Sequence, residues 1–165
     1  SIIDMKENKN CIIRYGNKTD KESVNKIRKQ VNDLHAKGRP DIFKKGFDDN
    51  IKNEINRFFD DENSDVIVAT IDNVVCGFAL IEYIVKGETT YNNPRKFYHI
   101  MEFGVDKHYR RMGVATNIMN FCKEESKKKS FTKLELNMWT FNESAEKFYE
   151  SVGFKTYRKD MELFL

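Results

Sequence analysis

Residues 97–122, FYHIMEFGVDKHYRRMGVATNIMNFC, decide the fold of this chain. The first part, residues 97–105, is dense in aromatic and aliphatic side chains and predicts a β-strand. The last part predicts a helix. The apolar residues there recur at the spacing of one helical face, at Val114, Ile118, Phe121 and Cys122. A short loop that contains Gly113 joins the strand to the helix.

This order of strand, glycine loop and helix start is typical of an anion site. Gly113 can adopt backbone angles that other residues avoid, and the first turn of a helix leaves several N–H groups without a partner. The positive end of the helix dipole lies behind those groups, so phosphate is the natural ligand. The loop matches neither the Walker A spacing nor the dinucleotide pattern G-x-G-x-x-G, because Gly113 is its only glycine.

The composition is typical of one soluble domain. The chain has 165 residues, 39% hydrophobic and 33% charged, which is enough for a sizeable core. We expect a polar N-terminal tail over residues 1–10 and a single domain over residues 11–165. No apolar run approaches the roughly 20 residues that span a bilayer, and no secretory signal is visible, so we expect no membrane contact. The net charge of +3 is too small to argue for a nucleic-acid partner.

Three cysteines, Cys11, Cys76 and Cys122, lack paired spacing and fall within expected strands or helices. We therefore expect buried thiols in a reducing cytoplasm, with no disulfide and no metal site.

The rest of the chain predicts further strands and helices. A capping box at Thr19 opens a helix that Gly38 and Pro40 end. Asp72-Asn73 predicts a hairpin turn between two strands. In order, we expect strands over residues 11–15, 66–71, 74–85, 97–105, 131–138 and 154–165, with helices from 20, 48, 114 and 142. The pattern β-α-α-β-β-β-α-β-α-β predicts an α/β fold, a mixed sheet with helices on its faces.

Two spaced motifs make a family resemblance specific. Residues 110–115 read R-x-x-G-x-A, and residues 142–154 read N-x-x-A-x-x-F-Y-x-x-x-G-F. Together with Val105-Asp106 they resemble the GCN5-related N-acetyltransferases (GNAT), which use acetyl-coenzyme A (acetyl-CoA). Ala115 stands where glycine is commoner, an accepted variant. The resemblance implies a GNAT-like, mostly antiparallel sheet with helices on both faces and a splayed parallel strand pair.

The resemblance also implies where the cofactor binds. The loop would hold the pyrophosphate through charge-assisted hydrogen bonds. Its expected binding residues are Arg110, Arg111, Met112, Gly113, Val114, Ala115 and Thr116. Backbone groups of Gly104 and Val105, in the gap between the splayed strands, would pair with the pantetheine arm as a pseudo-strand. Asn142 would reach the same arm, and it also suits the N-cap of its helix.

Acetyl transfer to an amine requires a base, a polarised carbonyl and an acid for the leaving thiolate. By the resemblance Tyr149 is that acid, although its place after Phe148 also suits a core aromatic. Glu102 and His99 are the two candidate bases, and we prefer Glu102. Their odd separation puts them on opposite faces of a regular strand unless a bulge intervenes, as it does in family members. Both alternatives stay open.

The expected function is acetyl transfer to a primary amine of a small molecule or peptide. The first two helices, the link between them and residues 86–95 should form the acceptor side. Candidate side chains there are His35, Arg39, Asp41, Phe43, Glu82, Glu88 and Tyr91, whose charges contradict one another. Acceptor identity and acyl-chain preference stay open. Homodimers are common in the family, and the expected final strand could support one. The alternative function is an acyl-CoA-binding sensor with little turnover.

Overall fold

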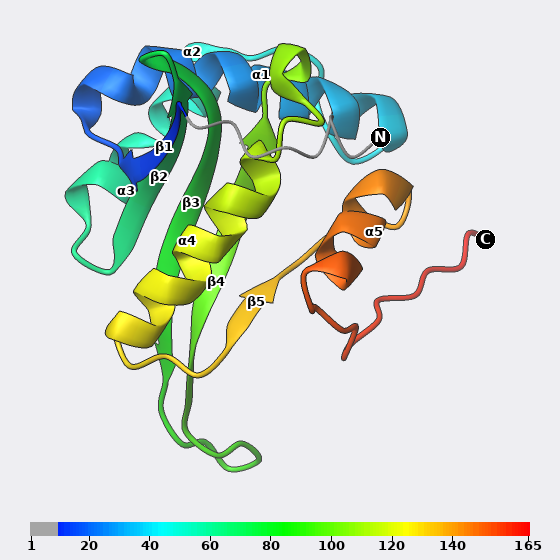
Figure 1. Ribbon diagram of the computed structural model, residues 1–165. Coiled ribbons are helices and arrows are strands. Elements are labelled where there is room, and N and C mark those ends of the chain that lie inside the picture. The colour runs from blue at the N-terminus through cyan, green and yellow to red at the C-terminus, as the bar shows by residue number, and fades with distance from the viewer. Residues whose placement is uncertain (1–9) are drawn as a thin grey trace.

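The computed structural model describes residues 10–165, so the expected tail lies outside the described residues except for Asn10. A five-stranded sheet forms the centre of the fold, with strand order β1-β2-β3-β4-β5 (Figure 1). Its strands are β1 (Cys11–Tyr15), β2 (Ser64–Ile71), β3 (Val74–Lys86), β4 (Arg95–Val105) and β5 (Leu134–Leu136). Neighbouring strands are antiparallel except β4 and β5, which are parallel. This is the predicted mixed, mostly antiparallel sheet.

Helices cover both faces of the sheet, as predicted. The α-helices are α1 (Lys21–Gly38), α2 (Asp49–Asn53), α3 (Asn56–Asp60), α4 (Val114–Lys128) and α5 (Glu143–Ser151), and two short 3₁₀ helices are η1 (Lys18–Asp20) and η2 (Lys107–Tyr109). α1 and α3 pack on one face, while α4 crosses the other (Figure 1). α5 follows β5 at the edge of the sheet.

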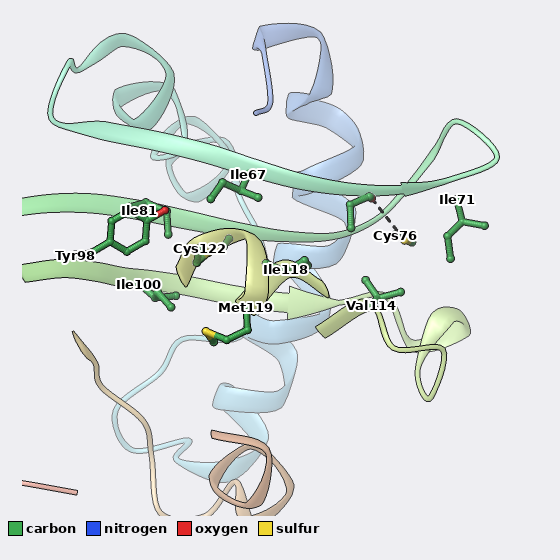
Figure 2. Close-up of a cluster of buried hydrophobic side chains, with 12 residues drawn as sticks. Ile67, Ile71, Cys76, Ile81, Tyr98, Ile100, Val114, Ile118, Met119 and Cys122 are labelled. Atoms are coloured by element: carbon green, nitrogen blue, oxygen red, sulfur yellow. Dashed lines mark hydrogen bonds between the residues drawn. The ribbon is translucent and has the colours of Figure 1, made fainter. Parts of the chain in front are cut away.

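The core lies in two layers, one on each side of the sheet. Between the sheet and α4, three residues of the predicted apolar stripe, Val114, Ile118 and Cys122, are at most 1% exposed and meet Ile81 and Ile100 (Figure 2), while the fourth, Phe121, is only partly buried. On the opposite side, α1 and α3 contribute a second cluster against β2 and β3: Val24, Ile27, Ile55, Phe58, Val66, Val68, Phe78 and Leu80. Removing this apolar area from water is the main favourable contribution to folding.

The hairpin between β2 and β3 is confirmed. Asp72 and Asn73 both have positive φ, 50° and 66°, and Ile71 pairs with Val74 directly beside them. Two left-handed residues in succession match the right-handed twist of the flanking strands, and Asn and Asp tolerate that conformation better than other side chains.

Two predictions for the N-terminal half are wrong. The capping box is not at Thr19: the Asn17 side chain caps η1, and the Asp20 carboxylate accepts from the Asn17 N–H at 2.9 Å. Asp20 also accepts from Arg14, and this guanidinium lowers the pKa of its carboxyl. The second helix, for which Asp48 or Asp49 was the expected cap, is capped by Asp48 and breaks into α2 and α3.

The C-terminal strands are also shorter than predicted. The strand expected over residues 131–138 is reduced to β5, because only three residues pair with β4 before the chain turns away. Residues 154–165 are extended but form no strand. A strand requires a backbone neighbour, and this segment is held by side chains instead, through Tyr157 to Glu135 and Glu162 to Arg39.

The three cysteines are free thiols, with Cys76 and Cys122 buried and Cys11 partly buried. Burial raises the pKa of Cys76 and of Cys122 to about 12, so both stay protonated and unreactive at neutral pH. Within residues 10–165, none of the helices combines the length and the hydrophobicity that a bilayer crossing requires.

Candidate functional site

A β-bulge in β4 brings the two candidate bases to one face. Ile81 of β3 pairs with Ile100, but the next residue, Leu80, pairs with Glu102, so Met101 is an extra residue in β4. The side-chain alternation resets at this point. His99 and Glu102 therefore both point toward the α1 side of the sheet, and Met101 is 48% exposed.

His99 belongs to a short chain of charged side chains. Its Nδ1 lies 3.6 Å from Glu82 Oε1, on the neighbouring strand β3. The other oxygen of Glu82 accepts from Arg57 Nη1 of α3 at 3.1 Å. The Glu82 carboxylate thus binds the Arg57 guanidinium through one oxygen and contacts the His99 imidazole through the other. This arrangement orients the ring and leaves Nε2 as the atom free to meet a substrate.

Glu102 is held more firmly, by a buried arginine of α1. Arg28 is 5% exposed, and its Nε and Nη2 each lie 3.2 Å from Glu102 Oε2. Its Nη1 donates to Asn25 Oδ1 at 2.9 Å and to the Ile51 carbonyl at 3.0 Å. The guanidinium therefore has hydrogen-bond partners on three sides, as a buried charge requires.

The loop between β4 and α4 has the features of an anion site. Gly113, at φ 79°, is the N-cap of α4, and no side chain caps the helix or places an acid in its first turn. The first intrahelical bond runs from Asn117 N to Gly113 O at 3.0 Å, so the N–H groups of residues 114–116 precede it. A Cβ added to Gly113 would meet nothing within 4 Å, which leaves open space before the helix.

The two arginines of the loop add positive charge at the same place. Arg110 and Arg111 are exposed, and neither forms an ion pair with a described carboxylate. Arg111 itself has a positive φ of 61°, so the loop contains two left-handed positions close together. Free guanidinium groups beside uncapped helix amides suit a diphosphate ligand.

The gap between β4 and β5 begins directly after their short ladder. Tyr98, His99 and Ile100 pair with Leu134, Glu135 and Leu136, and β4 then continues to Val105 with no partner on that side among residues 10–165. The backbone edge of residues 101–105 is therefore open toward β5. Such an edge can pair with an extended amide-containing ligand.

Gly104 has a second, steric role. A Cβ at this position would lie 2.8 Å from Val31 Cγ2 and 3.0 Å from Phe78 Cε1. α1 therefore packs directly on the backbone of β4 next to the site. The adjacent Asp106 caps η2 by accepting from the His108 N–H at 2.8 Å, which fixes the start of the loop.

Tyr149 lies on the other side of β4, in an aromatic setting. Its ring contacts Phe103 of β4, Phe148 and Phe154, with centroid distances of 6.2, 5.6 and 5.9 Å. Burial raises its pKa to about 12, so the hydroxyl remains protonated at neutral pH and can donate a proton. Asn142 at the start of α5 accepts from the Ala145 N–H at 3.2 Å, so its predicted capping role is confirmed.

Four aromatic side chains gather at the end of α1, where the acceptor was expected. His35 stacks on Phe43 at 4.9 Å, and Phe43 meets Trp139 edge-on at 5.1 Å. Phe141 contacts both His35 and Trp139. Burial lowers the pKa of His35, while the charge of Glu102 acts in the opposite direction, which places the cluster within electrostatic range of the bulge.

The other acceptor candidates are paired or distant. Arg39 binds Asp41 at 2.8 Å and Glu162 at 2.7 Å, and it lies over the Trp139 ring at 5.9 Å. These contacts raise the pKa of Arg39 and lower that of Asp41. Tyr91, 96% exposed in the β3–β4 hairpin loop, makes no ring contact with the aromatic cluster.

Sequence reasoning missed Arg28 and Arg57, and it assigned Glu82 only to the acceptor. Arg28 carries a usable signal, because it lies one turn after Val24 on the apolar face of α1, where a charge needs a buried partner. Arg57 carries no such signal, since its partner is a strand residue that only tertiary packing brings near.

Comparison with known proteins gives one family. The model of the acetyltransferase (GNAT) family matches residues 28–154. No curated protein sequence matches the chain significantly.

Solved structures share the fold over almost the whole chain. A tetramutant of the BH1408 protein from Bacillus halodurans has a TM-score of 0.89 and 26% identity, covering 93% of this chain and 99% of that chain. AAC(6')-Iy in complex with the bisubstrate analogue CoA-S-monomethyl-acetylneamine has a TM-score of 0.73 and 17% identity, covering 94% of this chain and 97% of that chain. The aminoglycoside acetyltransferase meta-AAC0020 from an uncultured soil metagenomic sample, in complex with sisomicin, has a TM-score of 0.63 and 14% identity, covering 94% of this chain and 95% of that chain. The last two likenesses concern the fold alone.

Proposed function

Because the chain belongs to the GNAT family of acetyltransferases, we propose that it transfers the acetyl group of acetyl-CoA to a primary amine by direct attack. The observation that carries this proposal is the arrangement around β4. One end of the strand leads into an uncapped helix start with free arginines, and its bulge presents two candidate bases.

The residues present fit the cosubstrate. The N–H groups at the start of α4, together with Arg110 and Arg111, would hold the pyrophosphate, and each charge-assisted hydrogen bond is worth about 1.5–3 kcal/mol. The open edge of β4 at Gly104 and Val105 would pair with the pantetheine arm, and Asn142 at the start of α5 would reach the same arm. Acetyl-CoA, when bound, supplies the thioester that makes the acetyl group transferable.

His99 is the base that the contacts favour. Glu82 and Arg57 orient its ring and leave Nε2 to take the proton from the amine as nitrogen bonds to the acetyl carbon. Glu102 was the preferred base on the sequence, but its carboxylate is already engaged by Arg28. In this proposal Glu102 retains a secondary role through its negative charge, which favours a cationic amine.

Tyr149 supplies the proton for the leaving group. As the carbon–sulfur bond breaks, the hydroxyl gives its proton to the thiolate, and coenzyme A leaves as a neutral thiol. A phenol whose pKa is about 12 is fully protonated when the reaction begins, as this role requires. The proton lost by the amine and the proton gained by sulfur thus pass through two groups on opposite sides of β4.

For the acceptor, we propose a small or peptide amine with an apolar or aromatic body. His35, Phe43, Trp139 and Phe141 offer an aromatic surface near the bulge. The nearby acids Asp41, Glu82 and Glu102 all have arginine partners in the chain. They are therefore poorly suited to several ammonium groups at once, although the neighbouring structures include enzymes described as aminoglycoside acetyltransferases.

The experiment is a thiol-release assay with acetyl-CoA and a panel of amines, combined with mass spectrometry of the products. The panel pairs aromatic monoamines with the polyamine sisomicin. We expect acetylated product and stoichiometric thiol release for the aromatic amines, and loss of turnover in Tyr149→Phe. Absence of release with every amine despite saturable acetyl-CoA binding would instead favour the sensor, and release that needs no amine would contradict transfer to an amine.

The sensor alternative and the proposed enzyme differ in what Tyr149→Phe changes. In a sensor, the variant should bind acetyl-CoA normally and lose nothing else. In the enzyme, binding should persist while turnover falls. Calorimetric titration with acetyl-CoA should therefore give the same affinity in both cases, and the thiol-release assay, run on the wild-type chain and on Tyr149→Phe, separates them.

A further inference from the structure

The ring of Phe141 lies directly on the backbone of α1. A Cβ added to Gly38, the last residue of that helix, would lie 2.3 Å from Phe141 Cε1 and 2.4 Å from Phe141 Cδ1. Ordinary contact between two carbon atoms begins at about 3.5 Å, so a side chain at position 38 and the ring cannot occupy these places together. This close approach joins the segment between β5 and α5 to the end of α1.

Neighbouring side chains join the same two parts of the chain. Phe141 contacts His35 of α1 at a centroid distance of 6.1 Å, and it contacts Trp139 at 6.3 Å. The guanidinium of Arg39, the C-cap residue of α1, lies over the Trp139 ring at 5.9 Å. Phe141 therefore cannot turn away from Gly38 without disturbing its contacts with His35 and Trp139. We call the packing of Phe141 on Gly38 and His35 the latch.

The latch is a second attachment for a segment that the sheet holds weakly. β5 pairs with β4 through three residues only, and the open edge of β4 follows directly. In Figure 1 the chain leaves the sheet after β5 and runs to α5. Residues 137–140 are thus fastened at both ends, by backbone pairing at β5 and by side-chain packing at Phe141.

The latch also fixes the start of α5. Phe141 directly precedes Asn142, the N-cap residue of the helix, whose N–H donates to the Trp139 carbonyl at 3.0 Å and closes a turn. Tyr149 follows Asn142 by about two helical turns and packs against Phe103 of β4. A shift at the first residue of so short a helix is carried to Tyr149, because a helix moves as a rigid element.

We infer that Phe141 is a positioning residue of the proposed acetyl transfer. Latched on Gly38, it holds the aromatic surface offered to the acceptor and the start of α5 in one arrangement. This inference rests on the proposed function, because its consequence is where the amine and Tyr149 meet. Phe141 acts through its neighbours and takes part in no proton transfer. A misplacement of about 1 Å by a change remote from the chemistry can lower a rate by about 10²-fold.

The latch lies apart from the two core clusters. Among the residues that the structure describes, neither cluster includes Phe141, His35 or Trp139. The free energy of global unfolding therefore depends little on the latch, whereas the local opening of the segment from residue 137 to α5 depends on it directly. A substitution that opens the latch should leave the fold intact.

The test is Gly38→Ala, alone and combined with Phe141→Ala. The added methyl group displaces the ring, and alanine itself suits a helix better than glycine, so the thermal midpoint should not fall. Amide hydrogen exchange without ligand should become faster in residues 139–146 and stay unchanged in β2. The value of kcat/KM for the amine should fall by about 10-fold or more. Once Phe141→Ala has removed the ring, Gly38→Ala should change neither quantity further.

Asn120→Ala is the matched control, because it also raises helix propensity but lies on the exposed side of α4. It should match the wild-type chain in exchange and in turnover. If Phe141→Ala fails to fold by circular dichroism, Phe141→Val, which also lacks the ring, takes its place in the double variant.

The outcomes separate the latch from the proposed function. Unchanged exchange in Gly38→Ala, or a further change when it is added to Phe141→Ala, would overturn the latch. Faster exchange with unchanged kcat/KM would overturn the positioning role. A wild-type chain that acetylates no amine would contradict the proposed function and with it the positioning role, while the exchange results would still decide whether the latch exists.

Discussion

His99 and Glu102 lie on the same face of the sheet although they are three residues apart, because Met101 is an extra residue in β4. Their partners differ, however: His99 faces a carboxylate, Glu82, and Glu102 faces a guanidinium, Arg28. The bulge thus brings two candidate bases to one face: His99, whose Nε2 is left for a substrate, and Glu102, whose carboxylate is paired with Arg28. Testing them separately is the direct way to assign the base.

We predict that His99→Gln slows turnover by about 10²–10⁴-fold, the usual contribution of a general base. Glu102→Gln should have a smaller effect on kcat. The measurement is kcat and kcat/KM of both variants with the same amine and acetyl-CoA, and the loss in kcat should be larger in His99→Gln than in Glu102→Gln. The reverse pattern would return the base role to Glu102.

A second prediction concerns the helix start that the cosubstrate would occupy. Gly113→Asp places a negative charge and a side chain before the N–H groups of α4, so acetyl-CoA affinity should fall by about 10²-fold or more, which corresponds to roughly two lost hydrogen bonds. Calorimetric titration measures the change. Gly46→Asp is the matched control, because Gly46 also has positive φ and open space around it. Equal affinity in the two variants would place the cosubstrate elsewhere.

The strand–loop–helix at the site could be predicted from sequence because its signals are local. The apolar spacing that starts at Val114 defines α4, and Gly113 alone of the loop residues is suited to the left-handed cap. Asp72-Asn73 fixes its hairpin for the same reason. In each case one or two residues determine the backbone, and distant parts of the chain are not needed.

The bulge and its ion pairs could not be predicted, because they depend on register between strands. No residue type marks Met101 as the extra one: its position follows from how β3 and β4 pair at both ends. The prediction of a final strand over residues 154–165 was wrong for a related reason. Its alternating pattern describes an extended segment, but pairing requires a neighbour, and β5 ends after three residues.

A third prediction tests the buried ion pair. Arg28→Met leaves Glu102 and the Ile51 carbonyl without their donor, and should lower the free energy of unfolding by about 2–4 kcal/mol, less than for a fully buried pair because Glu102 is 29% exposed. Adding Glu102→Met should recover much of that loss. Urea unfolding of Arg28→Met, Glu102→Met and the double variant gives the coupling energy, and strict additivity would show that the pair contributes nothing.

A fourth prediction concerns alkaline stability. The Tyr98 hydroxyl is buried beside the weakly polar Cys122 thiol and has no hydrogen-bond partner in the described part of the chain, and burial raises its pKa well above 10. The folded state therefore keeps a proton that the unfolded state releases, so stability is full below pH 10 and falls as the pH rises beyond it. Tyr98→Phe should flatten this fall and raise stability at neutral pH by about 1 kcal/mol. Thermal unfolding across that pH range is the check, and a large loss at neutral pH would mean the hydroxyl does have a partner.

The three-residue ladder between β4 and β5 has a consequence for motion. The segment from β5 to the C-terminus is joined to the sheet backbone by Tyr98, His99 and Ile100 alone, so it should open by local unfolding well before the rest of the sheet. A ligand bound between the start of α4 and the open edge of β4 would fasten both walls of this gap. Amide hydrogen exchange should then slow in β5 and α5 when acetyl-CoA is added. Cosubstrate capture and the ordering of this edge would thus be one coupled equilibrium, and coenzyme A release would loosen the edge again.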